Sequence, residues 1–380
     1  MYTLRIKELR KLNNITQSQL AKHLNVAHQS ISKWENHVTS PDIAYLPKLA
    51  AFFNVSIDVL MGLAPLESSY TNRNDITAEY WDQKYDLLIA MNHQALNDDY
   101  LRFLIRDVWK ITSSVDIADF GCGYGYLGLK LLPLLPEGST YTGYDISKKL
   151  IDHAMQLFVN HQLQGQFIEC DLNDYKVATK YDLVICKSFL QHHNNPSKIL
   201  RKMKCSGKSS ALIVCIEENR LIRNDGLFIE DLYNPIEKAQ ILKENWESEY
   251  QNDGRDYYLG FRIPSEMEKL GLLDVNIRSN DCVQYMSQRN ENYKHQVESL
   301  KTTMIWDQPF SNERIKNIFN YFQSRGLSKE GIKRYIEGEI KYSHHLNHHM
   351  PNIVRTLGLY ITYGRKPYEQ HSENKSEILE

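Results

Sequence analysis

The sequence predicts an all-α N-terminal domain followed by an α/β domain with helical insertions. Two observations predict this class. Through roughly the first sixty residues, apolar side chains recur at the spacing of short helices. From about residue 115 onward, short apolar runs alternate with helical segments, which is typical of a parallel sheet. A chain of 380 residues has room for two or three domains.

The composition excludes several classes of protein. Its hydrophobic fraction of 42% and charged fraction of 24% are typical of globular proteins, and a net charge of -2 gives no overall attraction to nucleic acid or membrane. No apolar run approaches the ~18 residues of a membrane span, and the charged N-terminus lacks the apolar core of a signal peptide. Six scattered cysteines form no CxxC pair, so we expect reduced thiols, a cytoplasmic location and no membrane partner.

The first domain begins with three short predicted helices. Residues 3–13 predict the first, with leucine and isoleucine on one face. Thr16 is the expected N-cap of the second, which ends near His23, and Asn25 marks a tight turn. The third covers 27–36. Two short helices joined by a turn of three or four residues form the helix-turn-helix pattern.

Residues 3–63 resemble the phage-repressor (XRE) family of DNA-binding domains. The resemblance rests on Thr16-Gln17, Leu20, Ala21, Val26, Ser30-Ile31-Ser32 and Trp34-Glu35. It implies double-stranded DNA as partner, the third helix in the major groove, a role in transcription regulation and a homodimer. Residues 1–63 carry seven lysines and arginines against four acidic residues, and this excess has the right sign for phosphate contacts.

The resemblance also implies which residues contact DNA. Outward side chains at the start of the third helix meet base edges, and the N-termini of the second and third helices point at phosphates. The expected base contacts are His28, Gln29, Ser32 and Lys33, and the expected phosphate contacts are Gln17 and Ser30. His37 stands where the family often has glycine, which alters the expected exit from the third helix.

The expected domain boundaries follow from changes in composition. The polar, aperiodic stretch near residue 70 predicts a linker, and the aromatic-rich helical segment after it predicts a cap or lid over a small-molecule site. We expect a helix-turn-helix domain over 1–66, a linker over 67–77, a second domain over 78–368 with helical insertions at about 220–258 and 288–350, and a polar tail over 369–380.

The stretch DIADFGCGYG, residues 116–125, is the strongest motif of the second domain. It places three glycines where an apolar strand gives way to a helix. Gly121, Gly123 and Gly125 let the backbone turn sharply and let a ligand approach without Cβ atoms in the way. Glycine spacing alone leaves a dinucleotide site open, but that fingerprint needs glycine where this chain has Tyr126.

Further predicted strands carry acidic residues at their carboxyl ends. Asp145 ends the second strand, about twenty residues after the glycines, where a carboxylate can bond ribose hydroxyls. Asp171 follows the third strand, within CDLND. YDLVICKSFLQHH contains the fourth strand and SSALIVCIEE the fifth.

These four motifs in this order resemble class I S-adenosylmethionine-dependent methyltransferases, over roughly 78–285 and again near the C-terminus. The resemblance implies a Rossmann-like fold and S-adenosyl-L-methionine as cofactor. The glycine backbone would hold its methionine part, Asp119 the amino group, Asp145 the ribose and Asp171 the adenine edge. The expected cofactor-binding residues are Asp119, Gly121, Cys122, Gly123, Asp145, Ile146, Asp171, Leu172 and Lys187.

The segment after the fourth strand bears on the methyl acceptor. Amino-methylating DNA enzymes carry an Asn/Asp-Pro-Pro-aromatic motif there, whereas this chain has KSFLQHHNNP. It also lacks the cysteine beside a proline that cytosine C5 enzymes need. We therefore expect a small-molecule acceptor. His193 is the candidate general base, because histidine titrates near neutrality, and the alternative is that His192 and His193 pack beside the loop.

HHLNHH, residues 344–349, raises the question of a metal. Two histidine pairs share helical faces at i, i+4, but no cysteine or acidic residue lies adjacent, so we expect a polar helix end and no metal.

For the chain as a whole we expect an enzyme acting on a small molecule, fused to a DNA-binding regulator. The alternatives are a sensor of cofactor or metabolite without turnover and a nucleic-acid methyltransferase.

Overall fold

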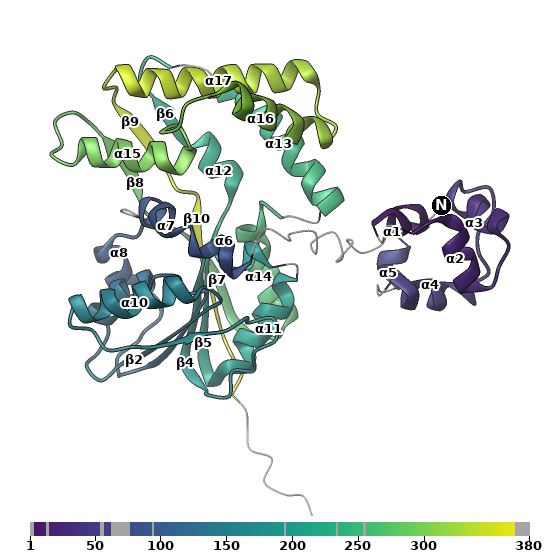
Figure 1. Cartoon of the computed structure of the whole chain (residues 1–380). Coiled ribbons are helices and arrows are strands. Elements are labelled where there is room, and N and C mark those ends of the chain that lie inside the picture. The colour runs from purple at the N-terminus through teal and green to yellow at the C-terminus, as the bar shows by residue number, and fades with distance from the viewer. Residues whose placement is uncertain are drawn as a thin grey trace, which may run out of the picture. The chain divides into compact units, whose positions relative to one another are not determined.

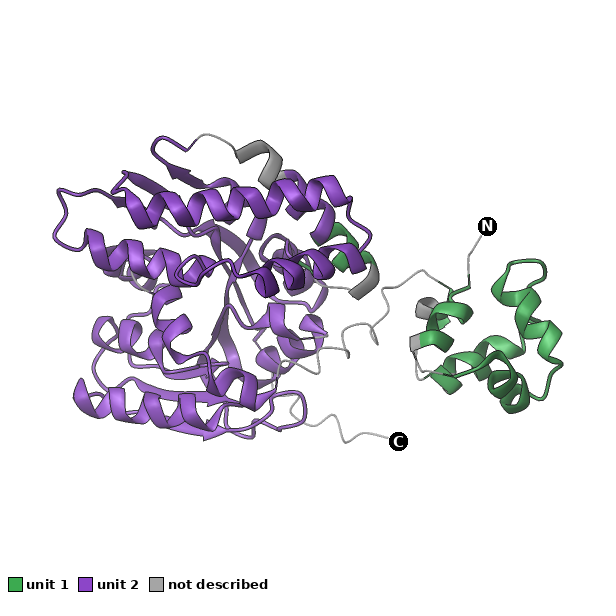
Figure 2. Cartoon of the chain, turned by 45° about the horizontal axis from the view of Figure 1, so that its top comes forward, with its two compact units in different colours: residues 1–75, 246–256 green, residues 76–245, 257–380 purple. Residues whose placement is uncertain are grey.

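The computed structural model describes most of the chain, as two compact units. The described residues are 4–12, 15–53, 57–61, 77–92, 95–193, 195–232, 235–253 and 256–368. One unit comprises residues 1–75 and 246–256, and the other comprises 76–245 and 257–380 (Figure 2). The second unit holds the glycine-rich stretch.

The first unit is helical, as the sequence predicts. Its helices are α1 (Ile6–Leu12), α2 (Gln17–Leu24), α3 (His28–Glu35), α4 (Tyr45–Phe53) and α5 (Ile57–Leu60). Their apolar faces meet in one core, in which Ile6, Leu9, Leu20, Ile31 and Leu49 are fully buried. The hydrophobic effect of this burial stabilises helices that are too short to persist alone.

Capping residues set the turn between α2 and α3. Thr16 forms a reciprocal capping box with Gln19, accepting its amide at 3.2 Å while the Gln19 side chain accepts the Thr16 amide at 2.7 Å. At the other end of α2, Asn25 has φ +54, the left-handed conformation that terminates helices. These contacts confirm Thr16 as the N-cap and Asn25 as the turn residue.

The second unit is built on a seven-stranded sheet within the described residues, in the order β3-β2-β1-β4-β5-β10-β7 (Figure 1). The strands are β1 (Asp116–Phe120), β2 (Thr140–Asp145), β3 (Gln166–Glu169), β4 (Tyr181–Lys187), β5 (Gly207–Glu218), β7 (Leu273–Ser279) and β10 (Leu359–Arg365). β1 to β5 pair in parallel, and β10 lies antiparallel between β5 and β7. The predicted parallel α/β sheet is confirmed for β1 to β5, and the antiparallel β10 makes the sheet as a whole mixed.

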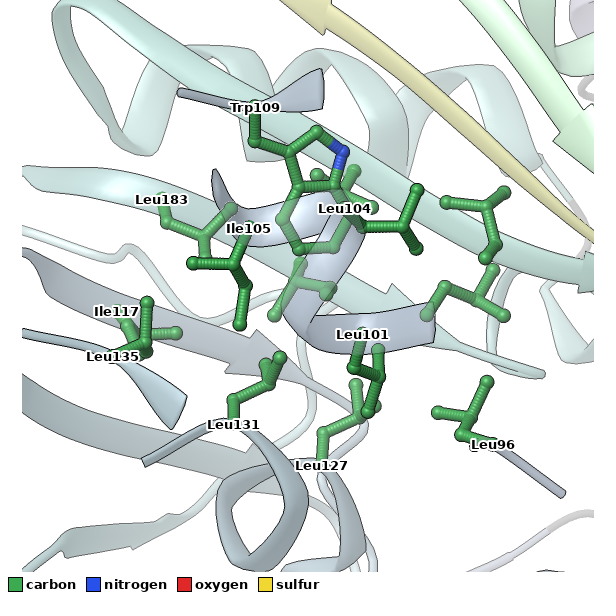
Figure 3. Close-up of a cluster of buried hydrophobic side chains, with 14 of the residues drawn as sticks. Leu96, Leu101, Leu104, Ile105, Trp109, Ile117, Leu127, Leu131, Leu135 and Leu183 are labelled. Carbon is green, nitrogen blue, oxygen red and sulfur yellow. The ribbon is translucent and has the colours of Figure 1, made fainter. Parts of the chain in front are cut away.

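Apolar clusters cover both faces of this sheet. One contains Trp109, Leu131, Ile117 and Leu183, together with helix α8 and the π-helical turn that follows it (Figure 3). The other contains Phe120, Val184 and residues of the helices that follow β4 and precede β7. The flanking helices are α8 (Asp98–Phe103), η2 (Leu104–Val108), α9 (Tyr126–Leu131), η3 (Leu132–Leu134), α10 (Lys148–Asn160), η4 (Leu190–His192), α11 (Pro196–Ser206) and α14 (Leu259–Lys269).

A second layer, here called the cap, follows β5 and β7. Its helices are α12 (Arg220–Asp225), the part of α13 (Pro235–Asp253) up to residue 245, α15 (Tyr293–Met304), α16 (Asn312–Ser324) and α17 (Lys329–His348). Its strands β6 (Leu227–Ile229), β8 (Val283–Met286) and β9 (Ile353–Thr356) form a small antiparallel sheet in the order β6-β9-β8. The sequence predicts helices in these segments but not this sheet. Its inner face packs Ile229, Met286 and Ile353 against Trp306.

Candidate functional site

The glycine turn lies at the carboxyl end of β1. The amides of Gly121 and Cys122 both donate to the carbonyl of Tyr144, at 2.8 and 3.0 Å. Gly121 and Gly123 have φ +73 and +54, conformations that favour glycine. A Cβ at Gly121 would lie 2.1 Å from Cδ2 of Phe189, whereas a Cβ at Gly123 would meet nothing nearer than Leu88 at 3.9 Å. The backbone at Gly123 is therefore open to a ligand.

Asp145 fixes this turn to the end of β2. Its Oδ2 accepts the amide of Gly123 at 2.8 Å, and its Oδ1 accepts the amide of Ser147 at 2.9 Å. Burial raises the pKa of Asp145, against the lowering effect of these amides. A carboxylate has about four acceptor positions, so the two oxygens can also accept ribose hydroxyls. The ribose contact stays a prediction, while the contact with the glycine turn is an additional role that the sequence does not reveal.

Asp119 has an unpaired oxygen beside the turn. Its side chain is 1% exposed, and Oδ2 accepts the hydroxyl of Tyr141 at 2.6 Å. Oδ1 is buried without a hydrogen-bond partner in the described chain. Burial raises the pKa of Asp119 to about 7, although the Tyr141 hydrogen bond lowers it. A buried oxygen that lacks a donor fits the amino group that the sequence assigns to Asp119.

Lys187 ends β4 on the same edge of the sheet. Its Nζ donates to Oδ1 of Asn92 at 2.6 Å and lies 5.6 Å from the ring centre of Tyr126. Burial lowers the pKa of Lys187, and the negative charges of Glu218 and Glu217 act in the opposite direction. The lysine is thus held by a residue from the helical segment before β1.

That segment, helices α6 (Ala78–Asp82) and α7 (Tyr85–Asn92), is tied to both sides of the site. Asp82 accepts the Ser147 hydroxyl at 2.7 Å, at the start of α10. The Trp81 ring contacts that of His192 edge to face, with centres 4.8 Å apart, in the loop after β4. Leu88 of α7 is the side chain nearest the open position at Gly123. These contacts connect the segment, here called the lid, to the loops around the glycine turn, and its role over a small-molecule site stays a prediction.

A buried carboxylate that the sequence interpretation missed holds the loop after β4. Oε1 of Glu217 accepts the amides of Phe189 and Leu190, at 2.8 and 2.7 Å, and the side chain is fully buried. Burial raises the pKa of Glu217 to about 7. Its Oε2 is a second buried oxygen without a partner in the described residues. The signal in the sequence is the pair of glutamates that ends the apolar run SSALIVCIEE.

The predicted adenine residues lie in the loop after β3. Oδ1 of the exposed Asp171 accepts the amide and the side-chain nitrogen of Asn173, at 2.8 and 2.9 Å. Leu172 is buried, and its carbonyl accepts Nζ of Lys202. Cys122 is also buried, and Ile146, half-buried, directly follows Asp145. The contacts of these residues with a cofactor remain predictions.

The two histidines after β4 have different neighbours. Nδ1 of His193 lies 3.3 Å from Oδ1 of Asn173, and its ring meets that of Phe189 with centres 4.3 Å apart. His192 contacts the lid through Trp81. Both therefore take part in loop packing, and the role of His193 as a base stays a prediction.

In the first unit, one candidate DNA-binding residue, Gln17, contacts a buried ion pair. Glu35 accepts Nε of Arg10 at 2.5 Å and the side-chain nitrogen of Gln17 at 2.7 Å. The Gln17 side chain is thus anchored to the end of α3. Of the other candidates, His28, Gln29 and Lys33 are exposed, and Ser30 and Ser32 are half-buried. His37 has φ +58, which explains why glycine suits that position.

The histidine-rich helix end forms stacked pairs. The rings of His344 and His348 lie 4.1 Å apart, and those of His345 and His349 lie 4.6 Å apart. Across the described residues, no three metal-ligating side chains come together. Among the described helices, none combines the length and the apolar character that crossing a bilayer requires.

Comparison with known families connects this geometry to a reaction class. A model of a methyltransferase domain matches residues 111–323, more than half of the chain, and a helix-turn-helix model matches residues 6–60. The chain belongs to the methyltransferase family. Its methyltransferase domain is of the type that uses S-adenosylmethionine, and it is fused to a helix-turn-helix domain. The open backbone at Gly123 and the unpaired oxygen of Asp119 fit that cofactor.

Curated relatives match the methyltransferase and the helix-turn-helix separately. A malonyl-[acyl-carrier protein] O-methyltransferase of Acetivibrio thermocellus is 33% identical over 101 residues, which cover 27% of this chain and 35% of that protein. A ubiquinone biosynthesis O-methyltransferase of Rickettsia typhi is 24% identical, with 53% of this chain and 76% of that protein covered. The HTH-type transcriptional regulator ImmR of Bacillus subtilis is 30% identical, over 26% of this chain and 82% of that protein.

Proposed function

We propose that this methyltransferase transfers a methyl group from S-adenosylmethionine to a small-molecule acceptor in the cytoplasm, and that its N-terminal unit binds double-stranded DNA as a homodimer and regulates transcription. The observation that carries the catalytic part is the unpaired, buried Oδ1 of Asp119 beside the open backbone of Gly123. A buried acceptor without a hydrogen bond is costly in free energy. A ligand that is cationic or donates a hydrogen bond offsets this cost.

The bound cofactor supplies a methyl group already activated on a sulfonium, so the protein mainly has to position the reactants. Asp119 binds the amino group and is held ionised by that positive charge, since its pKa of about 7 lies close to neutrality. Asp145 keeps the Gly123 amide in place. The lid, tied down through Asp82 and Trp81, excludes water from the site.

A small-molecule acceptor is supported by enclosure. The lid covers the glycine turn, and Glu217 holds the loop after β4 by accepting hydrogen bonds from two of its backbone amides, so this loop is not free to receive an extruded base. The relatives of the methyltransferase domain include proteins named ubiquinone biosynthesis O-methyltransferases, a name that refers to the synthesis of a small molecule. This combination favours a small acceptor over a nucleic acid.

DNA binding is supported by the surface of α3. Its N-terminal side chains His28 and Gln29, together with Lys33, are exposed and able to reach base edges. The Arg10–Glu35 ion pair joins α1 to the C-terminal end of α3. A helix-turn-helix reads one half-site, so recognition of a full operator favours a dimer.

The proposed reaction is tested by incubating the chain with S-adenosylmethionine as methyl donor and a small-molecule extract as the source of acceptors. The S-adenosylhomocysteine that forms is converted by a coupled hydrolase to homocysteine, which is measured. Release that depends on the extract and is lost in Gly123→Ala supports an enzyme. Binding of cofactor without release in any extract fraction supports the sensor instead. Tritium transferred from labelled cofactor into purified DNA would support the nucleic-acid alternative and contradict our assignment.

A further inference from the structure

Three arginines gather where β5 leads into the cap. Glu218 is the last residue of β5, and α12 follows it directly (Figure 1). Nη1 of Arg223 bonds Oε2 of Glu218 at 2.8 Å, and the side chains are 17% and 5% exposed. The guanidinium of Arg220 lies 4.8 Å from the ring centre of Tyr257, and its Nε is buried without a hydrogen-bond partner in the described residues.

The third arginine, Arg355, comes from the distant strand β9. Backbone bonds join this strand to α12: the Thr356 amide donates to the Gly226 carbonyl at 2.9 Å, and the Asn219 amide donates to the Gly358 carbonyl at 2.8 Å. Arg355 pairs with Gln284 of β8 and Leu227 of β6. Because Ile353 and Arg355 are buried and Val354 between them is exposed, the arginine faces inward with the cap core.

Arg355 is 3% exposed, and its Nε has no hydrogen-bond partner among the described residues. Nor does any described carboxylate form an ion pair with its guanidinium. The carboxylate whose charge acts on Arg355 is Glu218, which is already bonded to Arg223. Buried charges in proteins are normally paired, so an unpaired inward-facing guanidinium requires an explanation.

The charges of the cluster do not balance. Although burial raises the pKa of Glu218, Arg223 and Arg220 bring it down to about 2, so this carboxylate is ionised and supplies one negative charge. Burial and the neighbouring Arg223 lower the pKa of Arg355 to about 9, which still leaves it protonated at neutral pH. Three guanidinium groups therefore face one carboxylate.

We propose that Arg355 and Arg220 bind an anionic group, a carboxylate or a phosphate, of the methyl acceptor. This inference rests on the proposed function. The cluster lies at the carboxyl end of β5, beside β4, whose last residue Lys187 pairs in register with Ile216. Ligands of open α/β sheets bind at this edge, so the anion site and the cofactor residues share it. Arginine is the side chain best suited to a planar or tetrahedral oxyanion.

The test uses the full chain, with inorganic phosphate as the probe and S-adenosylhomocysteine as an independent ligand. Phosphate is titrated at constant ionic strength against chloride, and the melting temperature is followed. We expect phosphate to raise the melting temperature of the unmodified chain by about 2–4 °C at a concentration well above its Kd. Arg355→Met should lose this rise. Arg201→Met, which removes an exposed arginine of α11, should keep it.

The melting temperatures without phosphate separate a binding role from a structural one. Arg355→Met keeps the length of the side chain and removes an unpaired buried charge, so its melting temperature should equal or exceed that of the unmodified chain. Arg223→Met leaves the buried Glu218 carboxylate without its ion-pair partner, so this variant should melt several degrees lower than the unmodified chain. An Arg355→Met chain that melts several degrees lower, or that still responds to phosphate, would overturn the proposal. Arg355→Lys retains the charge and should keep part of the response.

Two further readouts identify the source of the anion. Phosphate that competes with the acceptor extract in the homocysteine assay supports an acceptor site, whereas phosphate binding without competition would overturn that assignment. Titration with S-adenosylhomocysteine is read in parallel. If S-adenosylhomocysteine does not bind but phosphate still raises the melting temperature, the proposed enzyme is refuted and the arginine site is not. If S-adenosylhomocysteine binds but phosphate has no effect, the arginine site alone is refuted.

Discussion

At the scale of single residues, Asp119 makes cofactor binding depend on pH. Its pKa is raised from 3.8 to about 7 by burial, so ionisation of the empty site lowers the free energy of unfolding as pH rises through this interval. A bound amino group offsets that cost. We therefore expect the affinity for S-adenosylhomocysteine to increase between pH 6 and 8, measured by calorimetric titration.

Asp119→Asn provides the control for this pH dependence. The asparagine keeps an acceptor for the Tyr141 hydroxyl but cannot ionise. Its affinity should fall about tenfold or more at pH 8, the cost of losing a charged hydrogen bond, and its pH profile should be flat. A profile as steep as that of the unmodified chain would mean that another group titrates.

Glu217 is the second buried carboxylate, and its main effect is on stability. Glu217→Ala leaves the amides of Phe189 and Leu190 without an acceptor, and each buried unpaired amide costs about 1–3 kcal/mol. We expect the free energy of unfolding to fall by about 2–4 kcal/mol in urea titrations. Glu217→Gln retains an acceptor oxygen and should lose much less. Equal losses in both variants would contradict the assigned contacts.

At the scale of elements, the ion pair between α1 and α3 holds the helix-turn-helix together. Burial raises the pKa of Glu35, but hydrogen bonds from Arg10 and Gln17 outweigh this effect and lower it below 4.5. The stabilisation is therefore complete above about pH 4.5 and is lost as pH falls through the lowered pKa. Arg10→Met should destabilise this unit by about 3 kcal/mol at pH 7, because Glu35 stays buried without its cation.

The loss of stability caused by Arg10→Met should become smaller as the pH falls and Glu35 becomes protonated. Thermal unfolding followed by circular dichroism at pH 7 and pH 3.5 measures both values. If the stability of the unmodified chain exceeds that of Arg10→Met by the same amount at both pH values, the ion pair contributes nothing to stability.

Helix α3 should determine DNA sequence preference. Gln29→Ala removes an exposed side chain that can bond adenine bidentately, and it should cost about 1–3 kcal/mol of specific binding without changing cofactor affinity. Lys22→Ala, an exposed basic residue outside α3, should weaken all DNA sequences alike. Fluorescence anisotropy with selected and scrambled duplexes distinguishes these effects. An unchanged sequence preference in Gln29→Ala would contradict the placement of α3 in the major groove.

The elements differ in how well the sequence predicts them. The strand-turn-helix at residues 116–131 is local, and its period and glycines suffice to predict it. The cap sheet escapes prediction because β6 has three residues and pairs with β9, more than a hundred residues away. Glu217 and Arg355 escape for a related reason: only tertiary packing shows that a charged side chain is buried.

At the scale of the whole molecule, the fusion raises the question of coupling between the two activities. If cofactor binding alters DNA affinity, DNA must alter cofactor affinity by the same factor. A change in only one of the two equilibrium constants would signify an artefact of one assay.

The most direct test of the central claim is a calorimetric titration of the unmodified chain with S-adenosylhomocysteine, with Gly123→Ala as the matched variant. We expect one site of micromolar affinity in the unmodified chain. In the variant, the added methyl group meets no protein atom closer than Leu88 and projects into the open space beside the turn, so binding should be lost. Because φ is +54 at this position, the alanine also costs about 1–2 kcal/mol of stability, and the fold should otherwise be retained. Absence of binding to the unmodified chain, or equal binding to both, would contradict a cofactor site at the glycine turn.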